Sequence, residues 1–209
     1  MTAAGRRAAA AAAVAALLLW PSTVPAAAGQ EAGPREPAPE EIGEVVREIE
    51  RLDALRSGLA RSFLGSGGDV DRETFRNVCQ PVGKELKSVA AENGWTVSQM
   101  AIRYRNPAHR ADSAARAVMA EMERDRELMG TWRRTETEGR EGVRYFRRIT
   151  VERACLACHG AKEDRPTFVK EGYPEDRAYG FEIGDLRGVY SVFVPAEADR
   201  NPSDDSERE

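Results

Sequence analysis

The feature that most constrains this chain is a short cysteine motif about three-quarters of the way along it. Residues Cys155-Leu156-Ala157-Cys158-His159-Gly160 read C-x-x-C-H. Two thiols three residues apart on one helical turn can reach two adjacent vinyl groups of a porphyrin, and the imidazole that follows can bind the iron. The motif therefore predicts one covalently bound c-type haem. Cys155 and Cys158 are expected to form its thioethers, and His159 is expected to be the proximal iron ligand.

Three other interpretations of the motif compete with haem. A zinc site would use Cys155, Cys158 and His159, but the usual second pair of Cys or His ligands is absent from the sequence. A thioredoxin-like dithiol normally follows the first strand of a βαβ unit, whereas this motif comes late in the chain. A disulfide between residues so close together closes a very small loop and stabilises little. Covalent haem is the interpretation that the spacing favours.

The first 28 residues have the composition of a cleavable secretory signal. Arg6 and Arg7 precede an apolar segment, 8–20, and Ala26-Ala27-Ala28 offers a cleavage site. The apolar segment is shorter than the roughly 20 residues that span a bilayer. We therefore expect cleavage, no stable membrane insertion afterwards, and a periplasmic protein. Export suits a covalently held haem, which cannot dissociate.

Charge excludes one class of partner. The whole chain has 31 basic and 35 acidic residues, and without Arg6 and Arg7 the balance is 29 against 35, a net charge of −6. An acidic protein is repelled by phosphate backbones. We therefore expect no nucleic-acid partner.

The N-terminal part of the mature chain is expected to be a linker followed by helices. Residues 29–40 are rich in Pro, Glu and Gly and have the composition of a disordered linker. Residues 41–64 repeat apolar side chains at spacings of three and four, typical of an amphipathic helix. That helix is expected to pack on the domain or on a second copy in a homodimer. Asp71 and Gly94 are placed to begin and end a second helix, whose apolar face would include Cys79.

Four later segments have the pattern of strands: 95–103, 131–137, 143–151 and 188–194. The last is almost continuously apolar, which suits a central strand covered on both faces. A third helix is expected over 112–129, an irregular segment over 161–179 and an acidic disordered tail over 197–209. The hairpin is expected to turn through 138–142. These elements predict an α+β haem domain over 70–196.

The ligand on the other side of the iron is less constrained. Cys79 is the one cysteine left without a partner, and it is either a small buried hydrophobe or a thiolate facing His159. The competing side chains are His109, Met100, Met119, Met122 and Met129. A sixth position open to a gas or to water is a further alternative.

Three arginines are candidates for contacts with the haem propionates. Arg105, Arg144 and Arg147 each carry a planar guanidinium that matches the geometry of a carboxylate. In so arginine-rich a chain, each of them could equally be a surface residue.

Several ordered motifs carry a resemblance to a known family. They are Val78-Cys79-Gln80-Pro81, Gly94-Trp95, Arg105-Asn106-Pro107, Arg144-Tyr145 with Arg147, the C-x-x-C-H motif, and Gly184-Asp185-Leu186-Arg187-Gly188. With them, residues 75–195 resemble a bacterial family of exported c-type haem domains with a PAS-like fold. Such domains often form the extracytoplasmic sensor part of histidine kinases and chemoreceptors.

The resemblance adds expectations about the fold and the iron ligands. It implies a PAS-like antiparallel sheet with flanking helices, and it implies Cys79 as the axial ligand opposite His159. The family tends to have Asn where His109 stands. His109 is therefore an alternative ligand, or a group that replaces Cys79 on a redox change.

Two functions follow as hypotheses. A sensor would lose one weakly held ligand on reduction, bind a small gas there and change conformation. A periplasmic electron-transfer cytochrome c would need only a six-coordinate haem with an exposed edge and a redox partner protein. No acid–base constellation accompanies the motif, so we expect no enzyme activity.

Overall fold

The structure, a computed structural model, describes residues 37–64 and 70–196. These residues all belong to one compact unit of the chain, Gly33–Glu209. The expected signal peptide (1–28), most of the expected linker (29–40) and the expected tail (197–209) lie outside the described residues. Within the described part of the chain, no helix combines the length and apolar character that a membrane span requires.

The centre of the fold is a four-stranded antiparallel sheet with the strand order β1-β4-β3-β2. Its strands are β1 (Thr96–Met100), β2 (Gly130–Thr137), β3 (Arg140–Thr150) and β4 (Leu186–Pro195). Every residue of β4 except Arg187 is buried, because β4 lies between β1 and β3 and is covered on both faces. The prediction of a central strand over 188–194 is therefore confirmed.

The β2–β3 hairpin turns more tightly than the expected loop over 138–142. Glu138 and Gly139 both have positive φ, 55° and 76°, and β3 already begins at Arg140. Two consecutive residues with positive φ make a two-residue turn whose twist matches that of the paired strands. Residues that were expected to form a loop thus extend β3.

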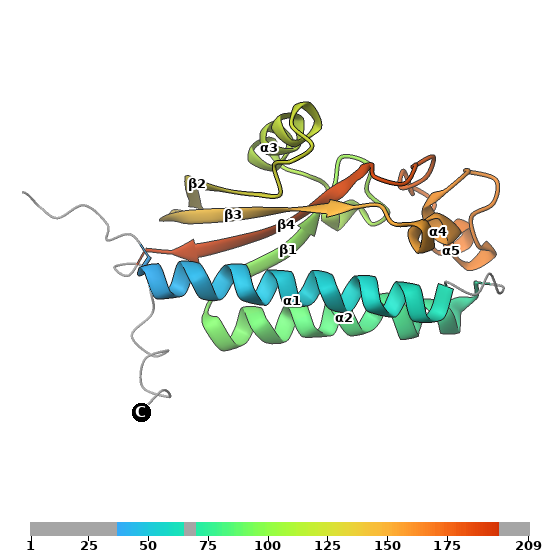
Figure 1. The fold of residues 1–209 in the computed structure, drawn as a ribbon, viewed down its shortest axis with the longest axis horizontal. Coiled ribbons are helices and arrows are strands. Elements are labelled where there is room, and N and C mark those ends of the chain that lie inside the picture. Colours follow the sequence, from blue (N-terminus) through green and yellow to red (C-terminus); the bar gives the residue numbers. More distant parts are fainter. Residues whose placement is uncertain (1–36, 65–69, 197–209) are drawn as a thin grey trace, which may run out of the picture. The chain divides into compact units, whose positions relative to one another are not determined.

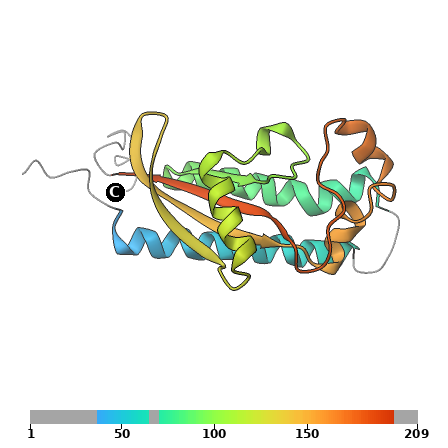
Figure 2. The same ribbon diagram turned by 90° about the horizontal axis from the view of Figure 1, so that it is seen from above.

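Two long helices cover one face of the sheet and a shorter helix crosses the other (Figures 1 and 2). They are α1 (Pro39–Leu64), α2 (Arg72–Asn93) and α3 (Ser113–Arg124). As predicted, Asp71 caps α2 by accepting the Thr74 N–H at 2.7 Å, and Gly94 ends it with φ 67°. The α3 helix stops five residues earlier than expected, because the Asp125 side chain accepts the Glu127 N–H and turns the chain.

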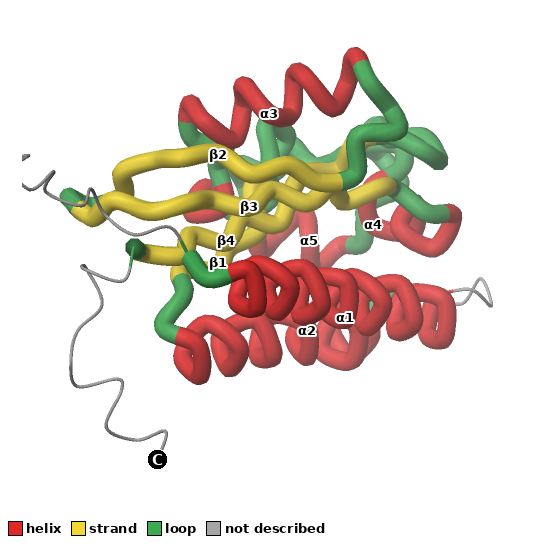
Figure 3. Tube along the Cα trace, turned by 60° about the vertical axis from the view of Figure 1, so that its left-hand side comes forward, coloured by secondary structure: helices red, strands yellow, loops and turns green. Residues whose placement is uncertain are grey.

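The α1–α2 face carries the larger apolar cluster. Val45, Ile49 and Leu52 of α1 are fully buried against the sheet, together with Leu86 and Val89 of α2. The apolar stripe predicted over 41–64 thus packs on the domain itself. Figure 3 shows the two helices lying side by side below the strands.

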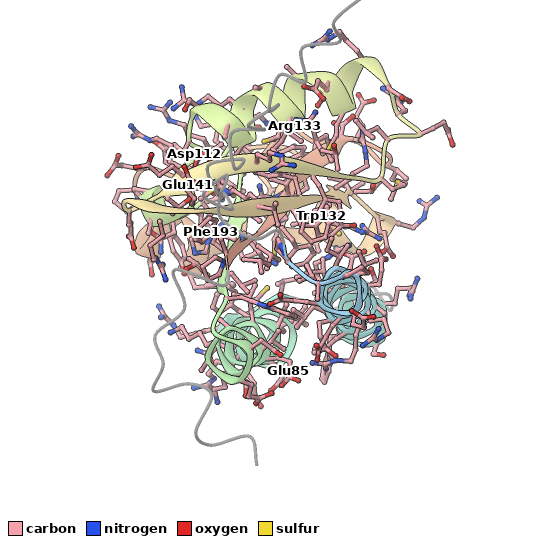
Figure 4. The ribbon with its side chains drawn as sticks, turned by 90° about the vertical axis from the view of Figure 1, so that its left-hand side faces the viewer. Glu85, Asp112, Trp132, Arg133, Glu141 and Phe193 are labelled. Carbon is pink, nitrogen blue, oxygen red and sulfur yellow. The ribbon has the colours of Figure 1, made fainter. Side chains whose placement is uncertain are left out.

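A second apolar cluster fills the space between the sheet and α3. It contains Met119 and Met122 of α3 with Phe146 and Val189 of the sheet. Successive β2 side chains separate the two layers: Trp132 packs on the α1–α2 side, whereas Arg133 pairs with Glu121 of α3 (Figure 4). The sheet therefore separates these two apolar clusters.

The cysteine motif lies at one end of the sheet, beyond the end of β3 (Figure 1). The 3-10 turn η2 (Arg153–Cys155) runs into α4 (Leu156–His159), and a further short helix, α5 (Thr167–Gly172), follows. The expectation that 161–179 is irregular was wrong for α5. Six residues are too few to show a helical period, and α5 buries Val169 and packs Phe168 on Phe75 of α2.

Candidate functional site

The motif forms one helical turn, as the haem interpretation requires. Cys155 ends η2 and His159 ends α4, so the two lie four residues apart on one side of the turn. The chain leaves the turn at Gly160, where a Cβ atom would lie 2.7 Å from the Leu156 carbonyl oxygen. Glycine is needed there because any side chain would collide with the backbone.

The motif faces a cavity of about 280 Å³ between α1, α2 and the adjoining end of the sheet. Cys155 and His159 line it from the motif, Cys79 lines it from α2, and His109 lines it from the 3-10 turn η1 (Pro107–His109). Residues from three separate segments thus share one space. Cys158 does not line the cavity, but it lies close enough to help raise the pKa of the Cys79 thiol.

The His159 imidazole is held in the tautomer of a metal ligand. Its Nδ1 lies 2.7 Å from the carbonyl oxygen of Ala178, which can only accept a hydrogen bond. Nδ1 therefore carries the proton and Nε2 keeps its lone pair. Arg105 Nη2 lies 3.4 Å from Nδ1. Because both nitrogens then carry hydrogen, this approach is a van der Waals contact and not a hydrogen bond. Burial, with the Arg187 and Arg105 guanidinium groups, holds the pKa of His159 well below its usual value, so the ring is neutral.

A short segment after α5 clamps the histidine from behind. The Phe181 N–H donates to the His159 carbonyl at 3.1 Å, and the Gly180 N–H donates to the next carbonyl at 2.5 Å. Asp176 in turn accepts the Ala178 N–H at 2.9 Å, which orients the peptide beside the imidazole. The histidine is thus positioned by backbone groups that its own helix does not supply.

Cys79 enters the cavity from a stripe of α2 that is distinct from the apolar face. Phe75, Cys79 and Gly83 recur at intervals of four residues and all line the cavity. The expectation that Cys79 points into the core was wrong, since the residue is exposed and opens onto this space. The protein around the cavity nevertheless desolvates the thiol, and this burial raises the pKa of Cys79 to about 11.

The structure separates the other candidate ligands. Met119 and Met122 are buried on the opposite face of the sheet, and Met129 does not line the cavity. Met100 lines it, but its Sδ lies 3.0 Å from Arg144 Nη2. His109 lines the cavity as well, and its burial, together with the nearby charge of Arg187, lowers the pKa of His109. Cys79 and His109 are therefore the candidates that face His159 across the cavity.

Of the three arginines considered for propionate contacts, only Arg105 lines the cavity. Arg144 pairs with Asp112 at 2.6 Å on the α3 side of the sheet. Arg147 pairs with Glu50 of α1 at 2.8 Å, on the other side. The structure does not bring these two to the site, because alternate directions along β3 send their side chains into the two helical layers.

Two further arginines line the cavity and were not singled out from the sequence. Arg56 reaches it from α1, with Nη1 3.7 Å from Cys155 Sγ, and Arg187 reaches it from the start of β4. Nothing local distinguishes Arg56 in a chain so rich in arginine. The motif around Gly188 could have indicated Arg187, since that motif carried part of the family resemblance.

Comparison with known proteins identifies the family. The sequence model of the Tll0287-like family matches residues 35–195, which is most of the chain. The chain belongs to the Tll0287-like family. A solved structure, "Crystal structure of the cyanobacterial heme-protein Tll0287", is 48% identical to it, covers 76% of this chain and 97% of its own, and has a TM-score of 0.68. No curated protein matches the chain.

The Tll0287-like match confirms the family resemblance and the α+β class with an antiparallel sheet and flanking helices. The donor set also fits a haem. An imidazole with a free Nε2 and a thiol lie on different walls of one cavity, and Gly83 opens space on α2, where a Cβ atom would meet nothing within 4 Å. Among residues 37–64 and 70–196, no three His, Cys, Asp or Glu residues are grouped to hold a metal ion, as a zinc site requires. In a haem complex, Cys155 and Cys158 would hold the porphyrin and His159 the iron.

Proposed function

We propose that this protein binds one haem covalently through Cys155 and Cys158, with His159 and Cys79 as its two iron ligands. The observation that carries the proposal is the shared cavity, whose lining includes both Cys79 and His159, an imidazole with Nδ1 engaged by the Ala178 carbonyl. The 48% identical relative, described as a heme-protein, adds support. Bound there, the haem supplies a metal that exchanges one electron and binds small ligands.

We infer that the protein acts in the periplasm, after removal of residues 1–28, as a redox- or gas-responsive protein. Its surroundings favour Cys79 as a thiol, since burial raises the pKa of Cys79 to about 11. Ferric iron counters this by stabilising the thiolate. In a haem complex, Cys79 would hold ferric iron as a thiolate, and after one electron from an external donor its protonated form would be the weaker ligand. His109, which lines the same cavity, or a small gas can then replace it.

Helix α1 provides a route from the site to a partner protein. Arg56 lies beside Cys155, Ser57 hydrogen bonds to Glu152 just before the motif, and Arg61 Nη1 lies 3.3 Å from Glu152. A movement of the motif therefore changes contacts along one side of α1. We propose that α1 passes the change on to a separate protein.

An electron-transfer cytochrome is the alternative. The backbone clamp on His159 favours it, because a rigid ligand keeps the geometry of the site similar in both oxidation states. Neither proposal includes a catalytic step, and no Asp or Glu of the described residues lines the cavity.

Two measurements test the proposed function. Acid–acetone treatment of the exported protein should leave the red pigment on the polypeptide, and loss of the pigment contradicts covalent attachment. Electron paramagnetic resonance of the ferric protein should then change in Cys79→Ser and stay unchanged in His109→Asn. An unchanged spectrum in Cys79→Ser removes this thiol from the iron.

The two candidate functions separate in the reduced protein. Addition of carbon monoxide should shift the visible spectrum within the mixing time if Cys79 has left the metal. Prolonged inertness to the gas, with fast electron exchange, supports electron transfer instead. The variant His109→Asn should bind the gas faster than the unmodified chain if His109 occupies the vacated position.

A further inference from the structure

A second cavity, of about 260 Å³, shares no lining residue with the one that the cysteine motif faces. Arg110, Arg116 and Arg177 line it together with Tyr104 and Ile102. No Asp or Glu of the described residues belongs to its walls. This cavity, which we call the arginine pocket, is therefore basic, whereas the whole chain has a net charge of −4.

The carboxylates closest in sequence to these arginines are engaged elsewhere. Asp112, just before the first residue of α3 (Figure 4), pairs with Arg144 at 2.6 Å. Asp176, which precedes Arg177, accepts a hydrogen bond from Arg165 at 2.9 Å. Among the described residues, no carboxylate oxygen lies within 4 Å of a guanidinium nitrogen of the pocket. Three positive charges therefore meet there without a carboxylate from this part of the chain.

The arginine side chains are oriented by contacts that leave hydrogen-bond donors free. Arg110 Nη2 donates to the Tyr104 hydroxyl at 2.9 Å. Arg116 Nε donates to the Ala111 carbonyl at 2.9 Å. The guanidinium groups of Arg110 and Arg177 lie 5.1 and 5.3 Å from the centre of the Tyr104 ring. Because a guanidinium carries five N–H donors in a planar fork, most of these donors remain for a ligand.

Backbone hydrogen bonds join the segments that carry the pocket. The Ala101 N–H donates to the His109 carbonyl at 2.9 Å, and the Ala111 N–H donates back to the Ala101 carbonyl at 3.0 Å. The Arg177 N–H donates to the Tyr104 carbonyl at 2.8 Å. The folded backbone thus brings the three arginines together before a ligand arrives, which lowers the entropic cost of binding one.

The charge and size of the pocket limit the ligands that suit it. Guanidinium groups match carboxylate and phosphate oxygens through paired hydrogen bonds. An anion with two or three negative charges offsets the repulsion among three arginines, whereas a monovalent anion leaves most of it. A cavity of about 260 Å³ suits a small molecule.

We propose that the arginine pocket binds a small anion with at least two negative charges, either inorganic phosphate or a polycarboxylate. Arg110, Arg116 and Arg177 donate hydrogen bonds to its oxygens, and Tyr104 positions the Arg110 guanidinium. The pocket includes none of the proposed haem ligands. The inference therefore goes beyond the proposed function and does not rest on it.

Isothermal titration calorimetry of the exported full chain, at neutral pH and constant ionic strength, tests the site. Inorganic phosphate and citrate are the two probes, and acetate is the monovalent comparison. At least one probe should bind to a single site about tenfold or more tightly than acetate. Whichever probe binds more tightly assigns the ligand to the phosphates or to the polycarboxylates.

Substitution of Arg177 shows whether the pocket itself binds the probe. Arg177→Gln should weaken the tighter probe about tenfold or more, because hydrogen bonds to a charged group are lost. Arg177→Lys should lie between, since it keeps the charge but loses the planar fork. If circular dichroism shows that Arg177→Gln does not fold, Arg110→Gln replaces it with the same expected loss.

A matched control removes the same charge from the other side of the sheet. Arg51 lies on α1, where it pairs with Glu48 at 2.9 Å and Glu85 at 2.7 Å. Arg51→Gln should leave the affinity for either probe unchanged. Equal losses in Arg51→Gln and Arg177→Gln would show attraction to the overall charge and would overturn the inference.

Two further results would also overturn it. One is the absence of binding by both probes up to millimolar concentrations, and the other is acetate binding as tightly as the probes. The heat of binding is measured whether or not the chain carries pigment. A lack of covalent pigment therefore contradicts the proposed function alone and leaves this test intact.

Discussion

The α1–α2 pair has two unlike ends. Near Trp95 the helices meet the sheet through fully buried apolar side chains, among them Ile49 and Leu52. Towards the cysteine motif, the same two helices present Arg56, Cys79 and Gly83 to a cavity. Close apolar contacts therefore stabilise the first end, which we call the packed end. The cavity end leaves space that a ligand can fill.

This difference shows that α1 both packs against the sheet and lines the cavity. Asp53 lies one residue after Leu52 and pairs with Arg56 at 2.9 Å and with Arg147 at 3.0 Å. Within one helical turn, α1 thus changes from apolar packing to an ionic network. Substitutions on the two sides of this boundary should have different consequences.

The largest expected effect is at the packed end. Leu52→Ala removes a side chain with no exposed surface and should lower the free energy of unfolding by about 2–5 kcal/mol. Urea unfolding followed by circular dichroism measures it. As a control, Ile183→Ala changes a side chain that is 52% exposed and should stay within about 0.5 kcal/mol of the parent. A loss below about 1 kcal/mol for Leu52→Ala would show that this end is loosely packed.

A matched pair of glycine substitutions sharpens the comparison. In Gly142→Ala the new methyl group would collide with the Val194 carbonyl and approach the Phe193 ring at 2.8 Å. We expect a loss of about 1–3 kcal/mol. In Gly83→Ala the methyl group meets nothing within 4 Å, and the gain in helix propensity should raise stability by up to about 1 kcal/mol. Thermal unfolding of both variants measures the two changes in stability, which should have opposite signs. Two changes of the same sign would contradict the expected difference between Gly142 and Gly83.

The smallest effect concerns the boundary between the ends. A hydrogen bond from Arg147 lowers the pKa of Glu50 below its usual 4.5. The folded state therefore binds this proton less readily than the unfolded state, so the pair stabilises above the unfolded pKa and loses its effect as the pH falls through the folded one. Because the Glu50 side chain is 48% exposed, Glu50→Gln should cost at most about 1 kcal/mol at pH 7.

Paired urea titrations at pH 7 and at pH 3 measure the Glu50 effect. The difference between parent and Glu50→Gln should shrink at the lower pH. A difference that is equal or larger at pH 3 contradicts an ionic contribution from this pair.

Much of the local structure could be predicted because it depends on near neighbours. The limits of α2 follow from Asp71 and Gly94, which satisfy the helix ends with their own atoms. The turn of the cysteine motif and the buried strand β4 likewise follow from short patterns. Helix α5 escaped prediction because six residues carry too little pattern.

The site was predictable only in part. The sequence identified the motif, and the family resemblance indicated Cys79, but the helical pattern placed this residue on the wrong face. Arg144 and Arg147 looked as suitable as Arg105, although only Arg105 lines the cavity. A guanidinium has the same chemistry wherever it stands, so its partner depends on where the strands and helices bring it.

By itself, the sequence determined most of the helices and strands and which thiols and imidazole form the C-x-x-C-H motif, because these depend on spacing along the chain. Only the tertiary structure decided that Cys79, His109 and Arg187 share a cavity with His159. These residues lie on separate elements, and their meeting depends on how α2, η1 and β4 pack around the end of one sheet.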